Sequence, residues 1–303
     1  MANRLLMWAA GSERLQRQMT ENAMAQRAAH RFVAGERLDE ALEAARRLNA
    51  DGIGGILDLL GEGVTDREGA AHAVEQYSEA ASAIARDGLD ATISIKLSQL
   101  GQTVDRAACV ANLNQILSHA DSLGVRVEID MEDHTLVPDT LDLFKTAASD
   151  HPGTRLAMQA MLRRTPLDLE ALRHLQPRVR LVKGAYAEPP AQALQGKREI
   201  REQFKFLIDW LFQHGGEPAF GTHDGDLINY ARAAAAKAGR APNEFEIQLL
   251  YGIRRDLQLD LARSGHRVKV YIPFGSAWYP YLTRRMAERP ANMLFFLRAL
   301  RGK

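Results

Sequence analysis

Four residues near the end of the chain, Tyr281, Arg284, Arg285 and Glu288, have the types and spacing of an anion-binding site. They recur at i, i+3, i+4 and i+7, so a helix would place them on one face. Two adjacent guanidinium groups are costly to desolvate without an anion, and their forked geometry matches a carboxylate or a phosphate. The segment therefore predicts an anion-binding helix, with a solvated basic face as the alternative.

A second charged segment lies in the middle of the chain. Arg180-Leu-Val-Lys183 has the pattern of a short strand, and Gly184 ends it before a proline-rich loop. A strand that is buried on both faces normally reads as continuously apolar. Arg180 and Lys183 therefore either face solvent or point into a site at the end of the strand, because a guanidinium must be paired or hydrated.

The elements that must position these residues alternate regularly between strand and helix. Short β-branched or apolar runs predict strands, and the periodic runs between them predict helices. The eight predicted strands are residues 53–60, 91–98, 125–130, 155–160, 179–182, 217–222, 244–249 and 266–272.

Strict alternation of strand and helix predicts a parallel sheet, and eight such units close into a (β/α)8 barrel. A doubly wound open sheet is the competing architecture, but no G-x-G-x-x-G sequence follows a strand. The functional site of a barrel lies at the carboxyl ends of its strands. The helix that carries the two arginines follows the eighth strand, so it can cross the barrel mouth.

The region before the barrel is rich in helix-forming residues. Residues 1–50 are predicted to be helical throughout and to pack on the barrel, ending near Asp51-Gly52. Residues 51–303 then form a single barrel domain, since such barrels take about 250 residues. Thr65 is predicted to cap the first barrel helix, with Glu68 completing a capping box.

Composition and charge exclude several classes of function. The net charge of +1 gives no global field that would attract nucleic acid. The single cysteine, Cys109, excludes a disulfide framework and a Cys-rich metal site, and its helical context predicts a core residue. His223 and Asp224 are adjacent and point apart, so no metal site is expected. No apolar run is long enough to span a bilayer, and the start lacks a signal-peptide pattern, so we expect a cytoplasmic protein.

Polar residues late in the predicted strands should point into one barrel mouth. The set contains no Ser/His/Asp order and no clear nucleophile, but Lys96 with the two arginines would bring three cations to one carboxylate or phosphate. The set consists of Asp58, Glu62, Lys96, Asp130, Gln159, Arg180, Lys183, Tyr186, Thr222, His223, Asp224, Gln248, Tyr251 and Tyr271.

Together these segments closely resemble, in order, the motifs of the proline dehydrogenase family. The resemblance runs from about residue 52 to residue 302. Within the family, the chain is most similar to the monofunctional bacterial branch. It rests on Lys96 in Ile-Lys-Leu-Ser, Asp130 in Ile-Asp-Met-Glu, Arg180-Leu-Val-Lys-Gly-Ala-Tyr186, Thr222-His223, Glu246-x-Gln248-x-Leu-x-Gly252, Tyr271-x-Pro-x-Gly275 and Tyr281-x-x-Arg284-Arg285-x-x-Glu288.

The resemblance implies a distorted (β/α)8 barrel whose last helix lies over the mouth, and a non-covalent FAD. It implies oxidation of L-proline to Δ1-pyrroline-5-carboxylate, the first step of proline catabolism to glutamate, with electrons passed to a membrane quinone. By this resemblance, the substrate carboxylate is bound by Lys96, Arg284 and Arg285, and Asp130 lies beside the substrate. The residues that would wall the proline ring are Leu181, Ala185, Tyr271 and Tyr281. The cofactor is assigned to Asp130, Gln159, Arg180, Val182, Gly184, Tyr186, Thr222, His223 and Glu288, with Arg180 next to the reactive flavin nitrogen.

One departure and two rival functions accompany the resemblance. Ala187 stands where some fused family members carry a tryptophan against the flavin. From the residues alone, a Schiff-base aldolase with Lys183 or Lys96 as nucleophile stays open. So does a non-catalytic barrel that binds an acidic ligand. The segment 293–300 is apolar enough to touch lipid at the inner face of a membrane, but packing against the barrel is the favoured use. The oligomeric state is left open.

Overall fold

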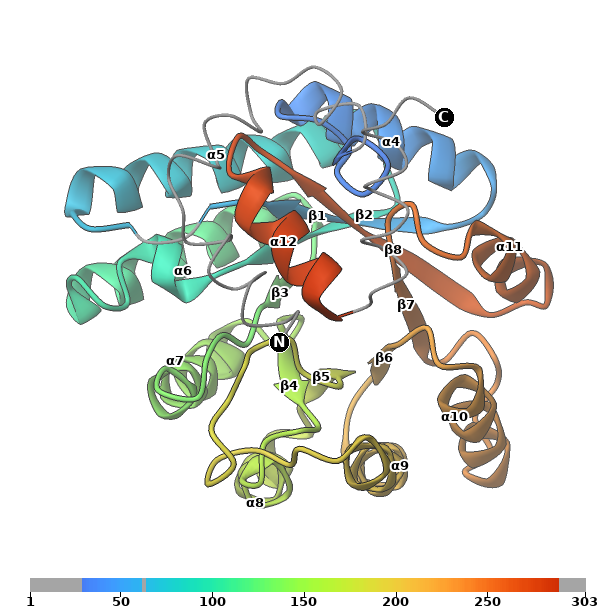
Figure 1. Ribbon diagram of the computed structural model, residues 1–303. Coiled ribbons are helices and arrows are strands. Elements are labelled where there is room, and N and C mark those ends of the chain that lie inside the picture. The colour runs from blue at the N-terminus through green and yellow to red at the C-terminus, as the bar shows by residue number, and fades with distance from the viewer. Residues whose placement is uncertain (1–28, 62–63, 289–303) are drawn as a thin grey trace.

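The computed structural model describes residues 29–61 and 64–288, with side chains as far as residue 283. Within these residues, eight strands form a closed barrel in which each strand runs parallel to the next and the last pairs with the first (Figure 1). The eight predicted strands are confirmed, with ends shifted by a few residues. They are β1 (Gly54–Leu59), β2 (Ala91–Ile95), β3 (Val127–Ile129), β4 (Arg155–Gln159), β5 (Arg178–Val182), β6 (Ala219–Gly221), β7 (Glu246–Leu250) and β8 (Arg267–Phe274).

Helices follow the strands and form the outer layer of the barrel (Figure 1). Short 3-10 turns, η1 (Leu97–Leu100) and η2 (Arg173–Leu175), come after β2 and α8. The α-helices between strands are α5 (Arg67–Arg86), α6 (Arg106–Ser122), α7 (Val137–Asp150), α8 (Thr165–Leu172), α9 (Lys197–His214), α10 (Gly225–Lys237) and α11 (Arg255–Arg263).

Helix α4 (Leu38–Ala50) precedes β1, and its apolar face shares the hydrophobic core of the barrel. The predicted helix is correct for this stretch, but residues 30–37 form turns and bends instead. The Glu40 carboxylate accepts hydrogen bonds from the backbone N–H groups of Glu36 and Arg37, which satisfies donors at the helix start. Residues 1–28 lie outside the described part, and the predicted domain boundary at residue 50 stays a prediction.

The predicted cap of the first barrel helix is wrong by one residue. Asp66, not Thr65, is the N-cap of α5, and its carboxylate accepts from the backbone N–H of Gly69 at 2.8 Å. A carboxylate is favoured at this position because it also interacts with the positive end of the helix dipole. Cys109 is buried in the core as predicted, and burial raises the pKa of its thiol to about 12.

The last described helix, α12 (Trp278–Glu288), lies across the open end of the barrel (Figure 1). Trp278, Tyr281 and Leu282 form a small apolar cluster with Phe32 and with Leu60, the residue after β1. The chain reaches α12 through Gly275, which has φ of +124°; a Cβ there would lie 2.9 Å from the Leu60 carbonyl oxygen. The predicted helix over the mouth is therefore confirmed. Among the described residues, no helix is both long and apolar enough to cross a membrane.

Candidate active site

Polar side chains from five strands meet inside the barrel near the carboxyl ends of the strands. Because side chains alternate along a strand, residues two apart point into the lumen together. Three of the group are nearly inaccessible to solvent, with exposures of 1% for Asp58, 7% for Lys96 and 4% for Arg180. We call this group the lumen cluster; its members are Asp58, Ser94, Lys96, Asp130, Arg180 and Tyr271.

Asp130 is the centre of the lumen cluster. Its Oδ2 accepts from the Tyr271 hydroxyl at 2.7 Å and from the Lys96 ammonium at 2.9 Å. Its Oδ1 accepts from the Ser94 hydroxyl at 2.8 Å and from the Arg180 guanidinium. Burial acts to raise the pKa of Asp130, but the charges of Lys96 and Arg180 outweigh burial and hold that pKa well below its usual range. Asp130 is therefore an ionised carboxylate at neutral pH.

The pKa of the second carboxylate of the cluster, Asp58, is shifted in the opposite direction. It pairs with Lys96, but burial raises its pKa and the nearby charge of Asp130 raises it further. Burial would lower the pKa of Lys96, yet the charges of Asp130 and Asp58 reverse this and raise it well above its usual value. Two carboxylates whose pKa values are pushed apart around one lysine are typical of a functional site.

These contacts modify the predicted role of Lys96. The sequence suggested that Lys96 would be one of three cations converging on a bound anion, whereas its ammonium contacts two carboxylates of the protein. A buried ammonium requires anionic partners, because it loses its hydration. A substrate carboxylate would have to share Lys96 with Asp58 and Asp130.

A second layer of charged side chains lies below the lumen cluster. Glu128 is on β3, two residues before Asp130, and therefore on the same face of the strand. Arg155 Nη1 lies 2.9 Å from Glu128 and 2.6 Å from Glu246, and Gln248 Nε2 donates to both carboxylates at 3.0–3.3 Å. Gln248 was expected at the mouth but belongs to this deeper layer.

The residues predicted to hold a cofactor lie at the carboxyl ends of β4, β5 and β6. Gln159 ends β4 and donates from Nε2 to the Glu132 carbonyl at 2.8 Å. Val182 and Gly184 are half-buried at the end of β5. After β6, the Thr222 hydroxyl accepts from the Asp224 N–H at 3.2 Å, and His223 Nε2 accepts from the Leu250 N–H at 3.1 Å. These residues all lie on one side of the barrel mouth.

Three predicted substrate contacts, Leu181, Ala185 and Tyr281, have different environments. Leu181 is fully buried and alternates with the inward-pointing Arg180, so its side chain lies on the outer side of β5, in the hydrophobic core. The structure does not bring Leu181 to the lumen cluster. Ala185 and Tyr186 are half-buried in the loop after β5, and Tyr281 is buried on α12.

Several other predicted residues have side chains outside the described part of the chain. Arg284, Arg285 and Glu288 lie in α12, as their spacing predicted, and their side chains are outside the described part. Glu62 also lies outside it. Lys183, considered as a nucleophile, is half-exposed and pairs with Asp224 at 2.8 Å.

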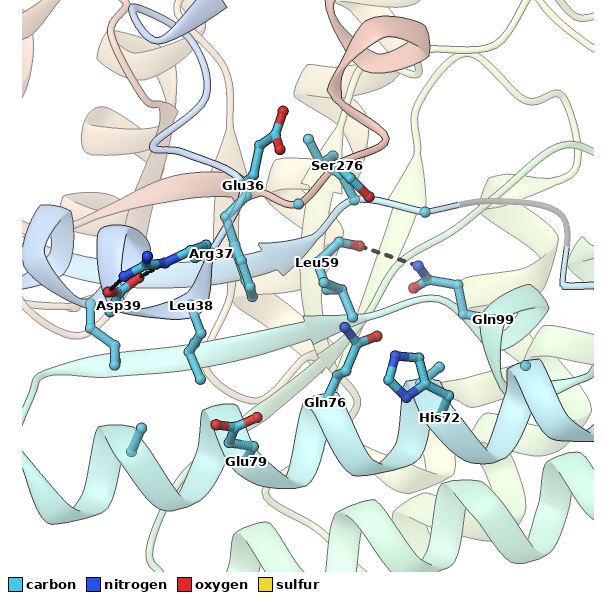
Figure 2. Close-up of a pocket in the computed structure, with 18 of the residues that line it drawn as sticks. Glu36, Arg37, Leu38, Asp39, Leu59, His72, Gln76, Glu79, Gln99 and Ser276 are labelled. Carbon is cyan, nitrogen blue, oxygen red and sulfur yellow. Dashed lines mark hydrogen bonds and ion pairs between the residues drawn. The ribbon is translucent and has the colours of Figure 1, made fainter. Parts of the chain in front are cut away.

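A groove with a volume of about 760 Å³ lies between α4 and α5, beside the residues that follow β1 (Figure 2). Glu36, Arg37 and Asp39 line one side of it, and His72 and Gln76 line the other. No member of the lumen cluster is among its lining residues. The groove reaches the carboxyl ends of β1 and β8 without being lined by the lumen cluster.

Sequence reasoning assigned no role to several residues that the structure brings together. Ser94, Glu128, Arg155 and Glu246 lie on strands, and Asp58 was expected at the mouth without a function. The sequence does contain a signal for them, because polar residues recur two apart in the strand patterns. Glu128 with Asp130 and Ser94 with Lys96 are two such pairs. That pattern indicates a polar barrel interior but does not show which side chains pair.

Comparison with known proteins identifies the family of this chain. The family model for proline dehydrogenase matches residues 41–298. The chain is 37% identical over 275 residues to proline dehydrogenase 1 of Bacillus subtilis subsp. natto, covering 91% of each chain. It is also 37% identical over 279 residues to the proline dehydrogenase of Deinococcus radiodurans, covering 90% of this chain and 89% of the relative.

The fold has solved relatives among larger proteins. Proline utilization A from Bdellovibrio bacteriovorus, inactivated by N-propargylglycine, superposes with a TM-score of 0.82 at 20% identity, over 94% of this chain and 38% of that chain. At this identity the similarity shows the fold alone. The match of the family model across most of the chain, together with relatives of similar length at 37% identity, shows that the chain belongs to the proline dehydrogenase family.

Proposed function

We propose that this protein oxidises L-proline to Δ1-pyrroline-5-carboxylate, using non-covalent FAD and passing the electrons to a membrane quinone. This would be the first step of proline catabolism to glutamate. The observation that carries the proposal is the lumen cluster around Asp130, which lies under the helix that contains Arg284 and Arg285, in a chain of this family.

The residues at the mouth would bind proline and orient it. Arg284 and Arg285 offer bidentate donors for the substrate carboxylate, and Lys96 adds a cation at the end of β2. Tyr271, Tyr281 and Ala185 would wall the ring. Hydride loss from the carbon next to nitrogen builds positive charge on that nitrogen, so the ionised Asp130 carboxylate beside the substrate favours the transition state. Holding the ring in a reactive orientation is the other contribution of these residues.

The residues present fit a flavin, for which Gln159 gives an observation independent of the family. Gln159 is 2% exposed, and its Oε1 has no hydrogen-bond partner among the described residues. A buried amide oxygen without a donor costs free energy, so a ligand that brings an N–H group would stabilise this site. The polar edge of a flavin ring carries such a group. FAD, when bound, accepts the hydride from the substrate.

The other predicted cofactor residues would hold the rest of FAD. Val182, Gly184 and Tyr186 would contact it at the end of β5, and Glu288 would reach it from α12. Thr222 and His223 would contact it in the turn between β6 and α10.

Arg180 would face the flavin rather than the substrate carboxylate. It lies on β5, and its guanidinium is 5.2 Å from the centre of the Tyr271 ring. The charges of Asp130 and Glu128 outweigh the effect of burial and raise the pKa of Arg180, so it remains a cation that can stabilise negative charge on the reduced flavin.

The Schiff-base alternative is disfavoured by the state of Lys96. A nucleophilic lysine must be neutral, which requires a lowered pKa, whereas two carboxylates raise the pKa of Lys96. Reduction of a quinone fits a cytoplasmic protein that touches the inner face of a membrane without crossing it. Turnover of proline with a soluble quinone tests the proposed function, and failure to reduce any quinone would contradict the assigned acceptor.

A further inference from the structure

The charged layer below the lumen cluster occupies a place where apolar side chains are expected. The interior of a (β/α)8 barrel is normally filled with layers of branched aliphatic residues. Here Glu128, Arg155, Glu246 and Gln248 fill it, and none is more than 3% exposed. Buried ion pairs are often no more stabilising than apolar residues of the same volume, because desolvation opposes the attraction. Stability alone therefore does not account for the layer, and a role in fixing geometry is the alternative.

The contacts of Glu128 show which geometry is fixed. Glu128 Oε1 accepts from Arg155 at 2.9 Å and from Gln248 at 3.1 Å, so its carboxylate is held from below. Its Oε2 lies 3.1 Å from Nη1 of Arg180, while Asp130 binds Nη2 of the same guanidinium. Asp130 directly follows β3 and is two residues from Glu128, so one short segment contacts both terminal nitrogens of Arg180.

The attraction between Glu128 and Arg180 is one of charge rather than of hydrogen bonding. Nη1 of Arg180 is buried and has no hydrogen-bond partner among the described residues, although the carboxylate is near it. Asp130 has the larger effect in raising the pKa of Arg180, and Glu128 is the second anion that raises it. Nη2 of Arg180 also donates to the Ser94 hydroxyl at 3.2 Å, so Asp130 and Ser94 anchor one end of the planar guanidinium. Glu128 anchors the other end, and without it Nη1 would be free to leave its place.

We propose that Glu128 is a positioning residue, which Arg155 and Gln248 hold in place and which fixes the Arg180 guanidinium toward the flavin. The inference rests on the proposed function, because it takes Arg180 as the cation beside the reduced flavin. Glu128 itself touches neither the substrate nor the cofactor in this assignment. Its effect should therefore appear in the flavin and in kcat, with little change in the Michaelis constant for proline.

The sign of the change in flavin midpoint potential separates positioning from a simple effect of charge. Glu128→Gln removes a negative charge, which acting through space would stabilise the reduced flavin and raise the potential. If Glu128 positions Arg180, the guanidinium turns away, the reduced flavin loses its cation, and the potential falls. We expect a fall, with the Michaelis constant for proline within about twofold of the wild type. An unchanged or raised potential overturns the proposal.

Two further variants control for charge and for folding. Glu246→Gln removes the same charge from the same layer, where it contacts Arg155 and Gln248 but not Arg180. Its potential should not fall, and a fall equal to that of Glu128→Gln overturns the proposal. The double variant Glu128→Gln/Arg155→Gln removes one charge of each sign, so the net charge of the layer is unchanged, and Glu246 keeps its ion pair with Arg267 at 3.3 Å. It should show the same fall in potential as Glu128→Gln.

Crystal structures of the flavin-free wild type and double variant test the positioning without any cofactor. We expect the Arg180 guanidinium to leave its wild-type orientation in the double variant while Asp130 and Tyr271 keep theirs. An unmoved guanidinium overturns the proposal. A wild-type protein that binds no flavin would refute the proposed cofactor instead, and the position of Arg180 would still decide the role of Glu128.

Discussion

Replacing Asp130 by asparagine tests whether the lumen cluster depends on one carboxylate. Each Asp130 oxygen accepts from one hydroxyl and one cation, so either orientation of the asparagine amide directs its NH2 group at a cation. The side chains of Asp130, Lys96 and Arg180 are all largely buried. Removing one partner of such a buried pair costs about 3–5 kcal/mol. We expect Asp130→Asn to lower the free energy of unfolding by about this amount at neutral pH.

The assay is urea unfolding of the flavin-free protein, followed by circular dichroism. Because the pKa of Asp130 is lowered in the folded state, its stabilisation is present above the unfolded pKa of about 3.9 and is lost as the pH falls through the folded value. The difference between wild type and variant should therefore be full at pH 7 and shrink below about pH 4. Asp142→Asn, at an exposed ion pair with Arg106, is the matched control and should leave stability unchanged. A cost for Asp130→Asn below about 1 kcal/mol, the value of an exposed pair, would refute the account of the cluster.

Three other predictions concern the cations. Arg284→Met and Arg285→Met should each raise the Michaelis constant for proline while FAD stays bound, since one charge-assisted contact contributes about 1.5–3 kcal/mol; an unchanged constant in both variants would place the anion site elsewhere. Arg180→Met should lower the flavin potential or its occupancy, and a variant with a normal flavin and only weaker proline binding would contradict this. Because Asp130 and Asp58 raise the pKa of Lys96, its stabilisation persists up to the unfolded pKa of about 10.4 and is lost only at higher pH. The cost of Lys96→Met in urea unfolding should therefore be constant between about pH 6 and pH 9, and a cost that fades within this range would be inconsistent with the raised pKa.

The architecture was predictable because alternating strand and helix patterns recur eight times at regular spacing. Each strand pattern carries little information alone, but eight in succession favour a closed barrel over an open sheet without a dinucleotide motif. Local details were less accurate. Thr65 and Asp66 are both good caps, and only the geometry of the entry to α5 selects Asp66.

The site was predictable in its residues and less so in its pairings. The motifs around Lys96, Asp130, Arg180 and Tyr271 pointed to one end of the barrel, where the structure brings these four side chains into contact. The sequence did not reveal that Lys96 is neutralised by carboxylates of the protein. Pairing inside a barrel depends on the stagger between strands distant in sequence, which periodicity within one strand does not contain.

The contact between Arg155 on β4 and Glu246 on β7 illustrates the same limit. The two residues lie 2.6 Å apart across the lumen, and neither strand pattern identifies the other as its partner. Leu181 shows the converse error, since its place in a family motif suggested a substrate contact while strand alternation turns it toward the core.

The most direct test of the central claim is the absorption spectrum of the purified protein, recorded without oxygen before and after addition of L-proline. We predict the bands of an oxidised flavin, bleaching when proline is added, and recovery of the bands when a soluble quinone follows. A colourless protein that reduces a nicotinamide cofactor with proline, or a bound flavin that proline leaves oxidised, would contradict the proposed function.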